Sequence, residues 1–151
     1  MKEIIIDGNN LIGKNKALSI IQKKDKAAAR EKLAFLLDRY YSNKALKAYL
    51  HFDGYKNISI AVENIRIIYS NEKTADEKIK AQIEQAKNRK SITVLTSDRN
   101  LQQFAKACSC GIISSENFWK IFQSMNQQDE EQSRIDEINN IEEFKKIFNT
   151  K

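Results

Sequence analysis

The 151 residues carry a formal net charge of +6, from 26 lysines and arginines, 20 acidic residues and one histidine counted as neutral. This length favours one domain, which buries roughly 70% of its unfolded surface and needs no disulfide to hold a core. No apolar run approaches the ~20 residues that span a bilayer, no signal peptide is visible, and the two cysteines stand at a spacing that rarely suits a disulfide. We therefore expect a soluble protein of the reducing cytoplasm with no membrane partner.

The charge is distributed unevenly along the chain. Residues 127–151 carry seven acidic and four basic side chains, a net charge of −3, which leaves +9 on the first 126 residues. A basic body with an acidic tail favours a polyanionic partner, most simply nucleic acid. Lysine-rich sequences also arise from ordinary solvated surfaces, so the alternative for each lysine is a solvated surface charge with no binding role.

The first element is an apolar run that ends abruptly in polar residues, Glu3-Ile4-Ile5-Ile6-Asp7-Gly8-Asn9-Asn10. A β-branched run without polar alternation predicts a strand covered on both faces, as in the parallel sheet of an α/β fold. Asp7 then lies at the carboxyl end of the strand, the edge at which open α/β sheets bind ligands. The alternative is that these polar residues only form a turn and cap the next helix.

Strands and helices alternate along the rest of the body, residues 1–125. Further strands are predicted at residues 45–54, 65–70, 91–98 and 111–114. A short helix and a lysine-rich loop are predicted after the first strand, then helices over 25–43 and 74–89, one after residue 98 and one through residues 118–125. This alternation predicts a parallel sheet with right-handed crossovers. A polar linker, residues 126–134, and an amphipathic helix or tail, residues 135–151, complete the chain.

Four aspartates recur at equivalent places in this pattern. Asp7, Asp53 and Asp98 each close an apolar strand, and Asp76 begins a helix that is reached from the end of another. Each one alone can be explained as a turn residue, a helix cap or a favourable charge in a first helical turn. A parallel sheet, however, brings all four to one rim. Two carboxylates ~4 Å apart repel by about 4 kcal/mol at an effective dielectric of ~20, so the cluster needs a counter-charge.

A divalent cation is the best candidate for that counter-charge, because Arg99 is the one obvious basic residue within these motifs. Oxygen ligands suit Mg²⁺ or Mn²⁺, whereas one histidine and a C-x-C pair are a poor ligand set for zinc. An acidic metal site in a basic body predicts phosphodiester chemistry by a metal-activated water. A metal-free mechanism would need a pair of proton-transfer groups, and His51 alone does not provide one.

The motifs resemble those of the NYN branch of the PIN-like ribonuclease superfamily, and in particular the bacterial YacP-type NYN domains. Four segments carry the resemblance in order: Ile4–Leu11, His51–Gly54, Thr74–Ile79 and Val94–Asp98. It covers residues 1–125 and implies a three-layer Rossmann-like PIN/NYN fold, with a central, mainly parallel sheet of four to five strands. Asn9 stands where many relatives carry an aromatic residue, and the acidic C-terminal segment lies outside the pattern.

The resemblance also implies a metal-dependent endoribonuclease that hydrolyses RNA phosphodiester bonds in mRNA turnover, with Mg²⁺ or Mn²⁺ as cofactor and the ribosome as an expected partner. The implied catalytic and metal-binding residues are Asp7, Asp76 and Asp98, with Asn10, Asp53 and Glu77 in support. Helix capping is the alternative role of Glu77. The basic residues near the first loop and the site are candidate nucleic-acid contacts: Lys14, Lys16, Lys23, Lys24, Lys26, Arg30 and Arg99.

Three alternatives compete with a nuclease. A non-catalytic RNA- or ribosome-binding module of the same fold has no reason to keep a cluster of repelling carboxylates. A response-regulator receiver needs an acidic pair near Asp7, where Gly8 and Asn9 stand. A haloacid-dehalogenase phosphatase needs a D-x-D motif, and Asn9 occupies its second position. We therefore place the nuclease first and the binding module second.

Overall fold

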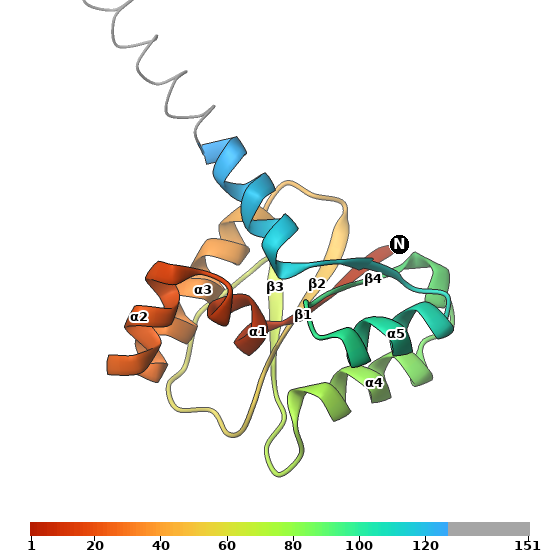
Figure 1. Ribbon diagram of the computed structural model, residues 1–151, viewed down its shortest axis with the longest axis horizontal. Helices are drawn as coiled ribbons and strands as arrows, with labels where there is room; N and C mark the ends of the chain where they lie inside the picture. Colours follow the sequence, from red (N-terminus) through yellow and green to blue (C-terminus); the bar gives the residue numbers. More distant parts are fainter. Residues whose placement is uncertain (127–151) are drawn as a thin grey trace, which may run out of the picture. The chain divides into compact units, whose positions relative to one another are not determined.

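The protein is described by a computed structural model over residues 1–126 (Figure 1). The chain divides into two units, Met1–Glu116 and the part from Asn117 onward. The sheet and the helices that carry the candidate site all belong to the first unit. Except for Asn126, which is helical, the predicted linker (126–134) and C-terminal helix or tail (135–151) lie outside the described residues.

Five strands form one sheet in which every neighbouring pair is parallel. They are β1 (Lys2–Asp7), β2 (Leu46–Phe52), β3 (Ile65–Tyr69), β4 (Ile92–Leu95) and β5 (Gly111–Ile113). Their order across the sheet is β3-β2-β1-β4-β5. The chain therefore builds β2 and β3 on one side of β1 and then returns to place β4 and β5 on the other. The point at which the order reverses lies between β1 and β4, where doubly wound sheets bind their ligands.

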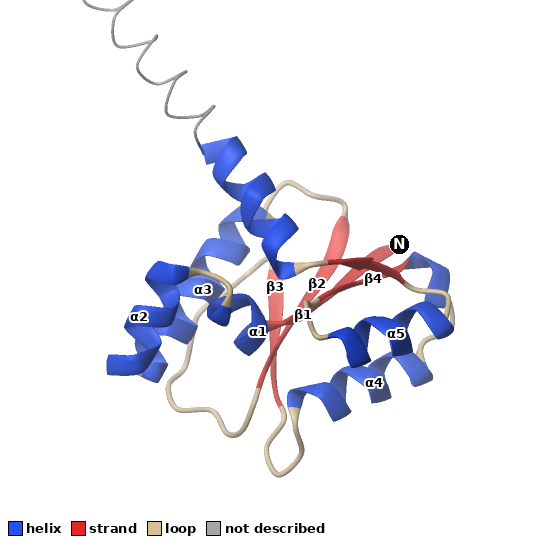
Figure 2. Ribbon diagram, viewed as in Figure 1, coloured by secondary structure: helices blue, strands red, loops and turns tan. Residues whose placement is uncertain are grey.

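Helices cover both faces of this sheet, which gives the three layers expected from the sequence (Figure 2). The segment between β1 and β2 supplies α1 (Gly8–Gly13), α2 (Lys16–Lys24) and α3 (Lys26–Tyr40) to one face. The other face carries α4 (Ala75–Gln85) and α5 (Arg99–Ala107), with a 3₁₀ turn, η1 (Arg89–Ser91), leading into β4. Residues 115–126 are also helical. The α/β fold class is confirmed.

The central strand β1 forms the middle of the core because its apolar residues are covered from both sides. Ile5 and Ile6 are fully buried. Ile5 belongs to a cluster in which apolar residues of α4, α5, β4 and the residue before β5 meet. These are Ile79, Ile83, Ile92, Val94, Leu101, Ala105 and Cys110. The apolar stripes of α4 and α5 thereby fix how these two helices lie on the sheet.

Gly8, directly after β1, is required by a close approach of two chain segments. A Cβ atom at this position would lie 2.6 Å from the carbonyl oxygen of His51 and 2.7 Å from Cε1 of Phe52. Real Cβ atoms do not come this close to their neighbours, so only glycine fits without displacing β2. Gly8 thus sets the packing between the end of β1 and the end of β2, the two strands that lead into Asp7 and Asp53.

Several element boundaries differ from those predicted. The lysine-rich stretch predicted as a loop contains α2, which begins where the Asn15 side chain accepts a hydrogen bond from the Leu18 N–H at 3.0 Å. β4 ends at Leu95 rather than residue 98, because Asp98 caps α5 instead of continuing the strand. α4 ends at Gln85, before residue 89. No helix among residues 1–126 is long and apolar enough to span a bilayer.

Candidate active site

A cleft of about 500 Å³ lies at the carboxyl ends of the strands. It gathers the four aspartates that the sequence places at strand and helix ends, together with Asn10. Its lining comprises Asp7, Asn9, Asn10, Asp53, Lys73, Thr74, Ala75, Asp76 and Asp98. Asp7 and Asp98, which are 91 positions apart in the sequence, therefore face one space at the edge of the sheet.

Thr96 links the two strands that meet where the strand order reverses. Its hydroxyl donates a hydrogen bond to Oδ2 of Asp7 at 3.0 Å and accepts one from the Asp98 N–H at 3.1 Å. The Thr96 side chain is fully buried, so water does not compete for these bonds. Because β-branched residues have few side-chain rotamers, Thr96 holds the Asp7 carboxylate in one orientation relative to the loop that carries Asp98.

Burial of the Asp7 carboxylate raises its pKa to about 6. The hydrogen bonds from Thr96 and from the backbone of Asn10 oppose this rise, and the charges of Asp53 and Asp98 add to it. Desolvation is therefore the main cause, and repulsion between carboxylates is a smaller one. A group with this pKa exchanges a proton near neutral pH, unlike an ordinary surface aspartate.

Asp53 positions α4. Its Oδ1 accepts a hydrogen bond from the Ala75 N–H, the first residue of the helix, at 2.6 Å. The Thr74 hydroxyl accepts a second bond, from the Glu77 N–H at 3.1 Å, as the capping-box spacing predicts. These two bonds fix the first turn of α4, which brings Asp76 to the cleft. Asp76 also forms an ion pair with Lys80, with 3.0 Å between Oδ2 and Nζ.

Asp98 and Asn10 are both engaged with the backbone around the cleft. Oδ1 of Asp98 accepts a hydrogen bond from the Leu101 N–H at 3.1 Å and so caps α5. Oδ1 of Asn10 accepts bonds from the Ser97 N–H at 2.9 Å and from the Ser115 hydroxyl at 2.7 Å. Asn10 therefore ties α1 to the loop after β4 and to the segment after β5. Its observed role is to position the loop that carries Asp98.

The donor set of the cleft suits a hard divalent cation, since it consists of carboxylate, amide and hydroxyl oxygens with no sulfur or imidazole. Among the described residues, no three acidic, histidine or cysteine side chains are close enough to one another to hold a metal ion together. Mg²⁺ keeps several of its waters and is commonly bound through one or two carboxylates plus substrate phosphates. The cleft therefore fits an ion held partly through water and substrate, not one enclosed by protein ligands.

Arg30 has a different place from the one that the sequence predicted. It was expected on a solvated helix face, among the nucleic-acid contacts, but it is only 2% exposed. Its guanidinium donates to the carbonyl oxygens of Asp53 and Tyr55 and to Oδ1 of Asn57, and it lies over the Phe52 ring at 5.1 Å. Arg30 therefore anchors the loop after β2 and is not available on the surface.

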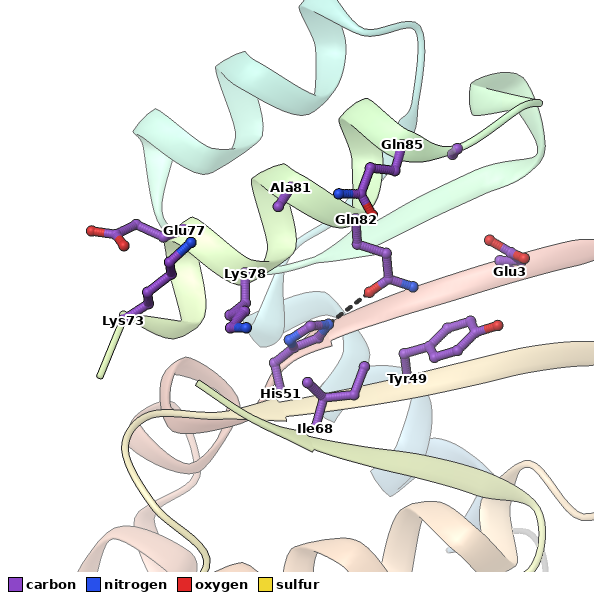
Figure 3. Close-up of a pocket in the computed structure, with 11 residues that line it drawn as sticks. Glu3, Tyr49, His51, Ile68, Lys73, Glu77, Lys78, Ala81, Gln82 and Gln85 are labelled. Carbon is purple, nitrogen blue, oxygen red and sulfur yellow. Dashed lines mark hydrogen bonds between the residues drawn. The ribbon is translucent and has the colours of Figure 1, made fainter. Parts of the chain in front are cut away.

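Glu77, predicted to support the metal site, does not line the cleft. Its side chain is exposed and borders a second pocket, lined by α4 and the strands (Figure 3). At the start of α4 the Glu77 backbone N–H donates to the Thr74 hydroxyl, which caps the helix. The contact of Glu77 at this helix end is therefore made by its backbone.

The remaining predicted nucleic-acid contacts are exposed but lie outside the lining of the cleft: Lys14, Lys16, Lys23, Lys24, Lys26 and Arg99. Lys14 forms an ion pair with Glu116, with 3.6 Å between Nζ and Oε1. The basic residue that does line the cleft is Lys73, which the sequence reading gave no role. Its position directly before Thr74, which caps the helix that carries Asp76, is the sequence feature that could have identified it. Thr96 was also given no role, although it lies within the Val94–Asp98 segment.

Comparison with known proteins identifies related sequences and folds. A family model described as the YacP-like NYN domain matches residues 4–150. The expectation that the C-terminal segment lies outside the pattern is therefore wrong, since the match continues through it. No curated protein matches the chain.

Two solved structures share the fold. The crystal structure of Rae1 (YacP) from Bacillus subtilis is 23% identical, with a TM-score of 0.72, over 98% of this chain and 92% of that one. A mutant form of the same protein is 24% identical, with a TM-score of 0.72, over 89% of this chain and 82% of that one. At these identities the likeness establishes the fold.

Proposed function

Because the chain belongs to the family of YacP-like NYN domains, we propose that it is a metal-dependent endoribonuclease that hydrolyses RNA phosphodiester bonds and acts in mRNA turnover. Family membership and the shared fold give a nuclease-like domain, and the proposal adds substrate, cofactor and reaction. One observation carries it. Asp7, Asp53, Asp76 and Asp98 line one cleft at the carboxyl edge of the sheet, beside the point at which the strand order reverses.

In this proposal Asp7, Asp76 and Asp98 hold Mg²⁺ or Mn²⁺ at the cleft. When bound, such an ion supplies an activated water and neutralises negative charge on the scissile phosphate. Other residues of the chain position these three ligands. Thr96 orients Asp7, Asp53 fixes the helix turn that carries Asp76, and Asn10 holds the loop that carries Asp98.

Lys73 is the cation that lines the cleft, and we assign to it the binding of a substrate phosphate. The side chain directly precedes Thr74, so it lies at the N-terminal end of α4, where backbone N–H groups also favour an anion. A phosphate placed there lies on the same side of the cleft as Asp76. The four carboxylates repel an approaching polyanion, and the positive charge of Lys73 offsets part of this repulsion.

Longer-range attraction of RNA is assigned to the exposed lysines around α2 and the start of α3. The first 126 residues carry a net charge of +9. If these lysines neutralise phosphates, the logarithm of the RNA-binding constant falls linearly with the logarithm of salt concentration. The ribosome is retained as a proposed partner that presents such RNA.

A non-catalytic RNA- or ribosome-binding module is the second candidate. One observation favours it, because no three metal-ligating side chains among the described residues are close enough to chelate an ion on their own. The two candidates differ in a single experiment. Purified protein is incubated with single-stranded RNA, with and without ribosomes, in EDTA, Mg²⁺ or Mn²⁺. The nuclease produces internal cuts only with a divalent cation, and the binding module leaves the RNA intact under all conditions.

A further inference from the structure

A second pocket, of about 510 Å³, lies between α4 and the strands β1, β2 and β3 (Figure 3). Tyr49, His51 and Ile68 rise from the strands to form its floor, and Gln82 and Gln85 project toward it from α4. The volume falls in the range of small-molecule and cofactor sites, and the lining mixes apolar surface with a few polar groups, as ligand pockets do. The proposed function as stated above does not use this pocket.

The pocket adjoins the carboxylate cleft. Lys73 lines both spaces, and the first turn of α4 contributes residues to each of them. On this turn Asp76 faces the cleft, whereas its neighbour Glu77 borders the pocket. A chain molecule that passes through the cleft with one phosphate at Lys73 can therefore place its next group in the pocket.

His51, in the floor of the pocket, provides a polar atom without a hydrogen-bond partner. The side chain is 2% exposed, and its Nε2 lies 2.7 Å from Oε1 of Gln82. A carbonyl oxygen only accepts hydrogen bonds, so Nε2 carries the proton and Nδ1 is left as an acceptor. This Nδ1 is buried and has no hydrogen-bond partner. Burial lowers the pKa of His51, the bond with Gln82 opposes this, and the charge of nearby Lys78 adds to it.

The groups around the pocket match the chemistry of an unpaired nucleobase. A base is a flat ring that stacks on aromatic side chains such as Tyr49. Glutamine amides such as Gln85 pair with the hydrogen-bonding edges of bases. The Nδ1 atom of His51 calls for an N–H donor, which every nucleobase carries on its ring or exocyclic nitrogens. Lys78 lies beside the His51 ring, and its flexible side chain can move to admit such a donor (Figure 3).

We propose that this pocket binds the base of a nucleotide adjacent to the scissile phosphate in single-stranded RNA. The inference rests on the proposed function, because it treats the pocket as a substrate subsite of that nuclease. A strand, and not a free nucleotide, is favoured by Lys73, which connects the pocket to the cleft. Base-paired RNA is excluded as the direct ligand, since the base must leave its stack to enter.

The test combines a protein variant whose pocket is filled by a larger side chain with RNAs that lack one base. Ala81 lines the pocket from α4, so Ala81→Trp fills it, and the matched control is Ala107→Trp at the exposed end of α5. Binding of short fluorescent single-stranded RNAs is measured with Ca²⁺ in place of the catalytic ion. One set of RNAs carries a single abasic position at each place in turn. Loss of a stacked base costs the wild type about tenfold in affinity at one position.

The proposal expects Ala81→Trp to bind intact RNA about tenfold more weakly and to lose nothing further with the abasic RNA, because both changes remove the same contact. Additive losses, or wild-type affinity of Ala81→Trp, would overturn it. If Ala81→Trp does not fold, Tyr49→Ala takes its place, with Tyr49→Phe restoring affinity. Absence of any RNA binding by the wild type would instead overturn the proposed function itself, and the subsite with it.

Discussion

The Thr96 hydroxyl donates to the Asp7 carboxylate at 3.0 Å across the boundary between β1 and β4, the point at which the order of the strands reverses. The same hydroxyl accepts from the Asp98 N–H at 3.1 Å. One buried side chain thus sets the relative position of two of the three proposed metal ligands. Replacement of Thr96 should therefore affect the site more than the fold.

Thr96→Val should lower metal-dependent cleavage by about ten- to a hundredfold, since its shape is kept while both hydrogen bonds are lost, at about 1 kcal/mol each. Thr96→Ser keeps the hydroxyl and should retain most activity. The measurement is the single-turnover cleavage rate at saturating Mn²⁺, with the midpoint of urea unfolding as the check on folding. Equal activity of the Val and Ser variants would contradict the assigned role.

Asp7→Asn should stabilise the metal-free protein at neutral pH. Burial raises the pKa of Asp7 from 3.8 to about 6. A raised acid pKa means that the folded state favours the protonated carboxyl. Its contribution to stability is complete below the unfolded pKa and is lost as pH rises through about 6. The shift corresponds to about 3 kcal/mol, which we reduce to about 2 kcal/mol because the carboxylate is partly exposed.

The measurement for this prediction is urea unfolding in EDTA between pH 4.5 and pH 8. The advantage of Asp7→Asn over the wild type should grow with pH and level off above about pH 7. Glu84→Gln, at an exposed acid on α4, serves as the control and should give no pH-dependent difference. A constant difference across the whole range would mean that the Asp7 carboxylate is not desolvated.

Arg30 and Lys26 lie on the same helix, and a comparison of their alanine variants should distinguish a structural role from an electrostatic one. Arg30→Ala should cost about 2–4 kcal/mol of unfolding free energy, because it removes a buried side chain and the bonds by which that side chain holds the loop after β2. Lys26→Ala, at an exposed position, should leave stability unchanged and lower the salt slope of RNA binding by about 1. The reverse pattern would show that the burial of Arg30 does not hold in solution.

The two glycines at the ends of α1 offer a matched pair for the packing of β1 against β2. Gly8→Ala should destabilise by more than about 2 kcal/mol, because its Cβ meets the His51 carbonyl oxygen at 2.6 Å. A Cβ atom added at Gly13 would have no other atom within 4 Å. Gly13→Ala should therefore leave the free energy of unfolding unchanged or raise it by a few tenths of a kcal/mol. Thermal unfolding of both variants checks the contrast, and equal melting temperatures would contradict it.

The presence of a strand before each aspartate was the most predictable feature of this sequence, although β4 ends at Leu95, earlier than predicted. The apolar runs before Asp7, Asp53 and Asp98 indicated strands, and a parallel sheet then required a common edge for the three carboxylates. Helix caps with a short local signature, such as Thr74 with Glu77, were predictable for the same reason, because they depend on neighbours in sequence.

Contacts across the sheet were not predictable from local pattern. The role of Thr96 depends on Asp7, 89 positions away. Arg30 was assigned to a solvated face because of its charge, although it shares a helical stripe with Ala34 and Leu37, which are fully buried. A cation at a buried position of a helix is the signal that could have identified it. Helical α2 was missed because its three lysines were taken to indicate a loop, although four apolar residues lie between Lys16 and Lys23.

The central claim is that aspartates at the ends of different elements act together on RNA through one divalent cation. Its most direct test is cleavage of a labelled single-stranded RNA by wild type, Asp7→Asn, Asp76→Asn and Glu84→Gln in Mn²⁺ and in EDTA. We expect cuts only with Mn²⁺, loss of more than about a hundredfold in rate for the two cleft variants, and a wild-type rate for Glu84→Gln. Cleavage by Asp7→Asn and Asp76→Asn at the wild-type rate would contradict the claim.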